Sequence, residues 1–196
     1  MAKLPASRPL RADARQNEDA LLQAAKAVFA VSGVDAPIRE IALEAGVGLA
    51  TLYRRFPKRT DLIAAVFRRE VDLCVAEAAT LRASQAPAAA LHAWLLRYAD
   101  FIATKQGLAA ALHSGDPAFA GLPDYFRANF EPALGGLLKA TDDNGAIRDD
   151  VLPYDLLRAI GNLSVASGED GRAHVERMVG LIFDGLRYGR SSQPEN

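Results

Sequence analysis

Hydrophobic residues recur at three- and four-residue spacing along most of the chain, which predicts a mainly helical protein. The first helix is expected from about Ala14 to Ser32, and Gly33 ends it. Residues 1–13 contain two prolines and several basic residues without a helical period, so we expect a disordered basic arm there. The apolar face of the first helix consists of Leu21, Leu22, Ala25, Val28 and Phe29.

The next stretch, residues 37–56, reads as two short helices joined by a tight turn. Apolar residues lie on one face of residues 38–45, and Gly46 follows where a left-handed backbone is needed to end a helix. In a second helix, about 49–55, Leu52 and Phe56 face the core. This spacing leaves four side chains pointing outward: Thr51, Tyr53, Arg54 and Arg55.

Two short helices around a glycine-containing turn form a helix-turn-helix, a motif whose second helix enters the DNA major groove. The outward side chains suit that task, because arginine binds guanine edges or phosphates and hydroxyl groups reach phosphate oxygens. Small residues at Gly48 and Ala50 let the helix approach closely. A buried helical hairpin with a solvated arginine pair would give the same pattern.

Several residues of this stretch resemble the DNA-binding domain of the tetracycline-repressor (TetR/AcrR) family, over about the first sixty residues. In that family the threonine and tyrosine of the motif's second helix touch the DNA backbone and bases, and a lysine that opens the domain's fourth helix touches phosphate. The resemblance implies these roles for Thr51, Tyr53 and Arg59. The resemblance rests on Ala27–Ala30, Gly33, Ile38–Ala42, Ala45–Val47, Thr51–Tyr53, Phe56, Arg59 and Leu62. The full set of candidate DNA-binding residues is Arg39, Gly48, Leu49, Ala50, Thr51, Tyr53, Arg54, Arg55, Lys58 and Arg59.

Two positions depart from the family pattern. Arg55 stands where members often have histidine, and this extra cation is expected to strengthen phosphate binding. Lys58 stands where Ser, Thr or Asn would cap the fourth helix, which leaves its start to Thr60 or to water.

A long helix is expected from about Arg59 to Leu81, followed by further helices to the end of the chain. Pro132 should kink or break the helix that contains it. Residues after 190 look disordered. The later helices are expected at 87–106, 108–113, 122–140, 154–167 and 172–188.

The last two predicted helices are apolar on more than one face, and glycines at 161, 180 and 185 permit close approach. Burial against a second copy explains this pattern, and burial within one chain is the alternative. The resemblance favours the first explanation, because family members dimerise through two C-terminal helices. The candidate dimer residues are Leu156, Ile160, Leu163, Val175, Val179, Ile182 and Leu186.

Aromatic residues gather between residues 67 and 130, with a few polar residues among them. Such a set lines many small-molecule sites, although helical aromatics are also ordinary core residues. The resemblance implies a small effector bound in this region. The candidate ligand residues are Phe67, Cys74, Trp94, Tyr98, Phe101, His113, Phe126 and Phe130.

Charge separates the two halves of the 196-residue chain, although its formal net charge is only −1. Residues 1–62 hold 10 Lys/Arg and 7 Asp/Glu, whereas residues 63–196 hold 13 and 17, so the basic end contains the helix-turn-helix. This distribution predicts salt-sensitive DNA binding. We expect a DNA-binding domain at 14–60, a regulatory and dimerisation domain at 61–190 and a tail at 191–196.

The remaining chemistry is sparse. A single cysteine excludes an internal disulfide, and the three histidines show no metal-site spacing, so no metal, cofactor or enzymatic activity is expected. No apolar run of about 20 residues or signal peptide is present, so we expect a cytoplasmic protein.

We therefore predict an all-α protein of about nine helices. Its expected function is sequence-specific DNA binding, as a homodimeric transcriptional repressor released from a palindromic operator by a small molecule. The alternative is a helical small-molecule-binding module with no sequence-specific DNA reading.

Overall fold

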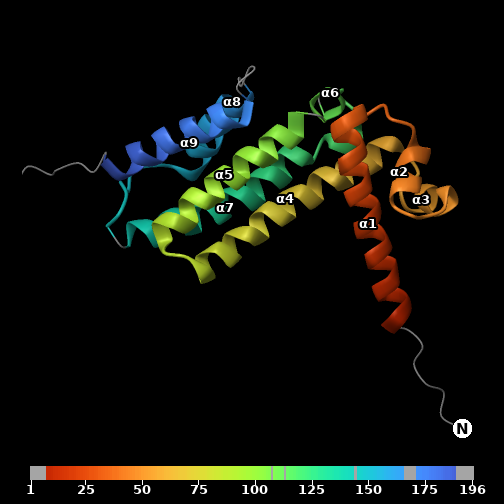
Figure 1. The fold of residues 1–196 in the computed structure, drawn as a ribbon, viewed down its shortest axis with the longest axis horizontal. Coiled ribbons are helices and arrows are strands. Elements are labelled where there is room, and N and C mark those ends of the chain that lie inside the picture. The colour runs from red at the N-terminus through yellow and green to blue at the C-terminus, as the bar shows by residue number, and fades with distance from the viewer. Residues whose placement is uncertain (1–7, 107, 113, 144, 166–170, 189–196) are drawn as a thin grey trace, which may run out of the picture. The chain divides into compact units, whose positions relative to one another are not determined.

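The computed structural model describes residues 8–106, 108–112, 114–143, 145–165 and 171–188 (Figure 1). The regular structure of these residues is helical, with no strand assigned among them, in agreement with the predicted fold class. The helices are α1 (Arg8–Ser32), α2 (Ile38–Glu44), α3 (Leu49–Arg55), α4 (Arg59–Ser84), α5 (Pro87–Gln106), α6 (Ala109–Leu112), α7 (Leu122–Asp142), α8 (Pro153–Val165) and α9 (Gly171–Tyr188), with a 3-10 turn at Pro117–Phe119.

One predicted helix start was wrong, and one expected interruption is not found. Helix α1 begins at Arg8, so residues 8–13 are helical rather than part of a disordered arm; Pro9 is tolerated in a first turn, and the alanines that follow favour helix. Helix α7 runs through Pro132 to Asp142, so a break at this proline is excluded, whereas the alternative of a kink stays a prediction. The rest of the predicted arm, residues 1–7, and the predicted tail lie outside the described residues.

The chain divides into two compact units. The first consists of Met1–Arg69 together with Gly107–Ala120, and the second of Glu70–Gln106 with Gly121–Asn196. The chain therefore passes between the units three times, once within α4 and once on either side of the segment that contains α6.

Apolar faces of the first three helices and the start of α4 form the core of the first unit. Figure 1 shows α2 and α3 beside α1. Leu21, Ala25 and Phe29 of α1 are buried, as predicted, whereas Val28 is half-buried. The core also includes Ile41 and Ala42 of α2, Leu52 of α3, Phe56, and Leu62, Ile63 and Val66 of α4.

The turn between α2 and α3 has a specific hydrogen-bonding pattern. Gly46 has φ +65°, its N–H donates to the Leu43 carbonyl at 3.0 Å, and the Val47 N–H reaches back to the Ala42 carbonyl at 3.0 Å. This pair of bonds is the Schellman motif that ends helices in glycine. The predicted helix stop at Gly46 is therefore confirmed.

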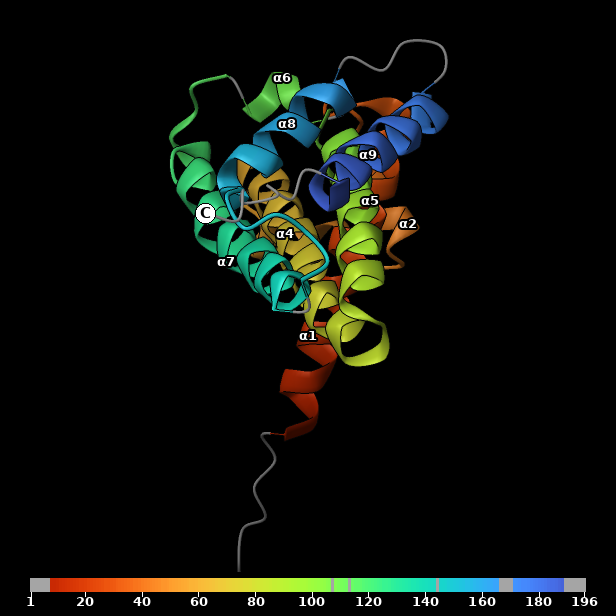
Figure 2. The same ribbon diagram turned by 90° about the vertical axis from the view of Figure 1, so that its left-hand side faces the viewer.

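In the second unit, α5 packs against α7, α8 and α9, and α8 packs against both α7 and α9 (Figure 2). Fully buried aromatic residues fill its centre, among them Trp94, Tyr98 and Phe130. Where α5 meets α9, the His92 and Phe183 rings lie 4.8 Å apart.

The predicted dimer residues need correction. Five of the seven are buried within the single chain, and only Leu163 and Ile182 remain partly exposed. When a helix is apolar on two sides, one side packs into the core of its own chain. Sequence spacing alone does not tell which side that is. The residues buried within the chain are Leu156, Ile160, Val175, Val179 and Leu186.

Candidate nucleic-acid interface

Helix α3 presents a polar outer face because its apolar residues hold it against the first unit. Leu52 is 1% exposed and Phe56 is 6% exposed. On a helix of 3.6 residues per turn, Ala50 and Arg54 then lie opposite Leu52. Both are exposed, and Tyr53 beside them is 49% exposed. The predicted division of α3 into core and outward residues is therefore confirmed for Leu52, Phe56, Tyr53 and Arg54.

The start of α3 is fixed by backbone rather than by a capping side chain. Gly48 is the N-cap residue in extended conformation, and its carbonyl accepts from the Thr51 and Leu52 N–H groups at 2.9 and 3.2 Å. A Cβ added at Gly48 would meet open space, so the exposed glycine leaves room for an approaching surface. Thr51 is half-buried rather than fully outward as predicted.

Arg55 extends from the end of α3 toward α1. Its Nη2 atom donates to both carboxylate oxygens of Glu18, at 2.6 Å each. The Arg55 guanidinium also lies 5.9 Å from the centre of the Phe56 ring. The extra cation at position 55 therefore forms an ion pair with Glu18, a residue outside the predicted DNA-binding set.

Arg59 supports the loop between α1 and α2. Its Nη1 atom donates to the carbonyl of Val34 at 2.5 Å and to that of Ala36 at 2.7 Å, and the side chain is half-buried. These bonds give Arg59 a structural role within the first unit. Its contact with a DNA phosphate stays a prediction.

The first turn of α4 is stabilised by Asp61. The Lys58 N–H donates to Oδ2 of Asp61 at 3.1 Å, so a carboxylate one turn into the helix reaches back to its cap position. Asp61 thus takes the capping role that the sequence pattern assigns to Thr60 or to water. Asp61 also places a negative charge where the helix dipole favours one.

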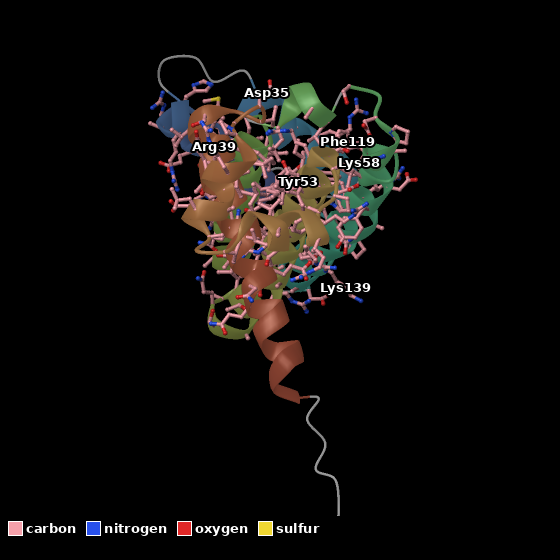
Figure 3. All side chains as sticks on the ribbon, turned by 90° about the vertical axis from the view of Figure 1, so that its right-hand side faces the viewer. Asp35, Arg39, Tyr53, Lys58, Phe119 and Lys139 are labelled. Atoms are coloured by element: carbon pink, nitrogen blue, oxygen red, sulfur yellow. The ribbon has the colours of Figure 1, made fainter. Side chains whose placement is uncertain are left out.

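Basic residues flank α3 on the same side of the first unit. Figure 3 looks onto this side and shows Arg39 and Lys58 to either side of Tyr53. Arg39 is exposed on α2 and Lys58 is exposed before α4. Three separate elements thus supply cationic or hydroxyl groups around the outer face of α3.

A depression of about 220 Å³ lies between α1 and α3. Its position could not be found from the sequence, because its two walls come from segments at least thirty residues apart in the chain. Its lining consists of Asn17, Glu18, Leu21, Thr51, Arg54 and Arg55.

The predicted ligand residues of the second unit are largely brought together. The rings of Trp94, Tyr98, Phe101, Phe126 and Phe130 form one cluster, in which neighbouring ring centres lie between 4.7 and 6.2 Å apart. Trp94 Nε1 donates to the Cys74 carbonyl at 2.8 Å, and the Tyr98 hydroxyl to the Leu157 carbonyl at 3.2 Å. These contacts give the rings the role of core residues in the structure as it stands.

The remaining three predicted ligand residues are Phe67, Cys74 and His113. Phe67 is buried in the first unit, and His113 lies outside the described residues. The Cys74 thiol belongs to the core, and burial raises its pKa to about 12. No group of three or more His, Cys, Asp or Glu residues is placed to hold a metal ion in the described part of the chain.

None of the described helices is both long and apolar enough to cross a membrane.

Two family models match the chain. "Bacterial regulatory proteins, tetR family" matches residues 21–66, and "Transcriptional regulator SbtR-like, C-terminal domain" matches residues 86–188. An HTH-type transcriptional regulator of Staphylococcus aureus (strain USA300) is 34% identical over 67 residues, which are 34% of this chain and 36% of that protein. The chain thus spans about a third of the length of the curated relatives it matches.

Solved structures agree over nearly the whole chain. A TetR transcriptional regulator from Streptomyces coelicolor is 38% identical with a TM-score of 0.75, covering 86% of this chain and 97% of that one. A TetR regulatory protein from Mycobacterium vanbaalenii is 36% identical with a TM-score of 0.71, covering 91% and 99%. LfrR from Mycobacterium smegmatis, solved with proflavine, is 26% identical with a TM-score of 0.61, covering 89% and 96%. With its helix-turn-helix and both family models in place, the chain belongs to the TetR family of DNA-binding transcriptional regulators.

Proposed function

We propose that this regulator is a homodimeric repressor that binds a palindromic operator through α3 and leaves it when a small molecule binds the second unit. The observation that carries the proposal is the outer face of α3, where Tyr53 and Arg54 are exposed above a buried Leu52. A short helix held by its apolar side and fixed by a Schellman turn can enter a major groove without changing shape.

Each polar group around α3 has a role that follows from its place. Arg54, opposite the buried side of α3, reads base edges, since arginine pairs with guanine in the major groove. The hydroxyls of Tyr53 and Thr51 bind phosphate, as do Arg39 and Lys58 at the two sides. Substitution of Arg54 changes the preferred sequence, whereas loss of a phosphate contact weakens binding to all sequences.

The dimer interface is formed by an apolar stripe of α9 that remains partly exposed within the described residues. Met178 and Ile182 on this stripe are half-buried, Leu181 is 63% exposed, and Gly185 follows one turn later. These positions repeat at three- and four-residue spacing beside the buried stripe. Leu163 of α8 is also partly exposed and joins the same interface. A two-fold dimer then matches a palindrome with half-sites about 34–36 Å apart.

The effector binds among the aromatic residues between α5 and α7. LfrR, which shares the fold, was solved with the flat aromatic molecule proflavine. Because the rings of this chain contact one another, a ligand has to separate them, and that rearrangement selects a dimer with its recognition helices wrongly spaced. Trp94, the only tryptophan, reports binding by its fluorescence.

Selection of bound sequences from random DNA, with the purified chain at moderate salt, tests the proposal. We expect a palindrome, and light scattering should give the mass of two chains. Recovery of sequence-blind binding alone, or of a non-palindromic site bound by a monomer, would refute it. If an operator is selected but no aromatic compound releases the protein from it, the DNA-binding part of the proposal holds and the effector part is refuted.

A further inference from the structure

Glu18 of α1 holds the guanidinium of Arg55 in an ion pair. Nη2 of Arg55 donates to both oxygens of the carboxylate at 2.6 Å, and the two side chains are 57% and 30% exposed. An ion pair open to water is weak and exchanges readily with other ions. Arg55 can therefore leave Glu18 and bind another anion that attracts it more strongly or is present at a higher concentration.

The pair forms part of the wall of the 220 Å³ depression between α1 and α3. Among its six lining residues, Asn17, Thr51, Arg54 and Arg55 carry hydrogen-bond donors, and Glu18 is the one acid. Donors gathered around a hollow next to α3 suit a phosphate group. In the free protein, the Glu18 carboxylate occupies the position that an external anion would take among these donors.

On the basis of the proposed function, we propose that this depression receives a phosphate of the operator backbone and that Glu18 is its internal competitor. DNA binding transfers Arg55 from the carboxylate to the phosphate. Charge-assisted hydrogen bonds to the two anions are similar in strength, so the exchange itself is nearly neutral. The displaced carboxylate then stays beside a phosphate of like charge, and Glu18 thereby weakens operator binding.

Substitution of Glu18→Gln tests the proposal, because the amide keeps the size of the side chain and removes only its charge. We expect binding to a selected operator about two- to fivefold tighter at low salt, which reflects a weak exposed ion pair and a removed like charge. The plot of log affinity against log salt should keep nearly the parent's slope, because Arg55 neutralises the same phosphate in both proteins. In an Arg55→Ala background, the same substitution should give a much smaller gain.

Asp19→Asn is the matched control. Asp19 is the next residue of α1, and its carboxylate faces Arg69 at 3.6 Å instead of Arg55. We expect the Asp19→Asn protein to bind as the parent does. An equal gain in this variant would mean a general charge effect and would overturn the proposal.

Unchanged or weaker binding by the Glu18→Gln protein would also overturn the proposal, weaker binding indicating that Glu18 orients Arg55 rather than competes for it. In both cases the parent still binds its operator, so the proposed function stands. If the parent binds no operator, the proposed function and the competitor role fail together.

Discussion

Replacement of Arg59 by alanine is expected to destabilise the protein as well as to weaken DNA binding. The Arg59 guanidinium donates to the Val34 and Ala36 carbonyls at 2.5 and 2.7 Å, and these bonds hold the loop between α1 and α2 against the start of α4. A hydrogen bond from a charged group contributes about 1.5–3 kcal/mol, and water replaces part of it at a half-buried site. We expect a loss of about 2 kcal/mol in the free energy of unfolding, which lowers Tm by roughly 4–8 °C in a chain of this size.

Thermal unfolding followed by circular dichroism measures this change. Arg54→Ala is the control, since an exposed arginine on α3 should alter stability by no more than about 0.5 kcal/mol. An Arg59→Ala protein as stable as the parent would refute the reasoning. Arg59→Lys separates the two roles: it keeps the charge for a phosphate, but its single ammonium does not reproduce the guanidinium geometry, so DNA binding should recover more than stability.

Three further predictions concern other parts of the chain. Tyr53→Phe should weaken binding to all DNA sequences several-fold in gel-shift titrations, whereas Arg54→Ala should change the sequence that random-DNA selection recovers. Leu181→Glu should yield folded monomers by light scattering, because Leu181 is 63% exposed on α9; Val179→Glu, at a fully buried position, should unfold the chain. Burial raises the pKa of the Cys74 thiol from 9.0 to about 12, so the unfolded chain releases this proton first and the stability contribution of the neutral thiol is lost between about pH 9 and 12. Cys74→Ala should flatten that alkaline decline in denaturant titrations.

Local features of the fold could be predicted from the sequence because they depend on neighbouring residues. The stop of α2 at Gly46 needs one left-handed residue, and the burial of Leu52 follows from helical spacing. Contacts between distant segments left no such signal. Arg55 and Glu18 are 37 positions apart, and nothing in either neighbourhood marks the other as its partner. The same reason hid the bonds from Arg59 to the loop after α1.

The apolar helices at the end of the chain show a different limit. Spacing identified both Val179 and Ile182 as apolar positions of α9, but it could not tell that the first lies in the core and the second is partly exposed. That choice depends on how α9 rotates against α5 and α8, and the rotation is set by side chains on all three helices. The pattern on one helix therefore predicts which of its faces are apolar, but not what each face packs against.

The first unit is assembled from two pieces of sequence, and this has a consequence for how the protein can be made and divided. Its second piece, Gly107–Ala120, brings in Leu108 and Phe119, both about 5% exposed or less. A ribosome has to synthesise the chain beyond residue 120 before all of this apolar surface exists. A fragment that ends after Arg69 lacks the apolar residues of Gly107–Ala120. A chimaera that joins the first unit to another regulator therefore has to include this later segment as well. A fragment that is to retain all of this buried apolar surface therefore has to include two separate stretches of the gene.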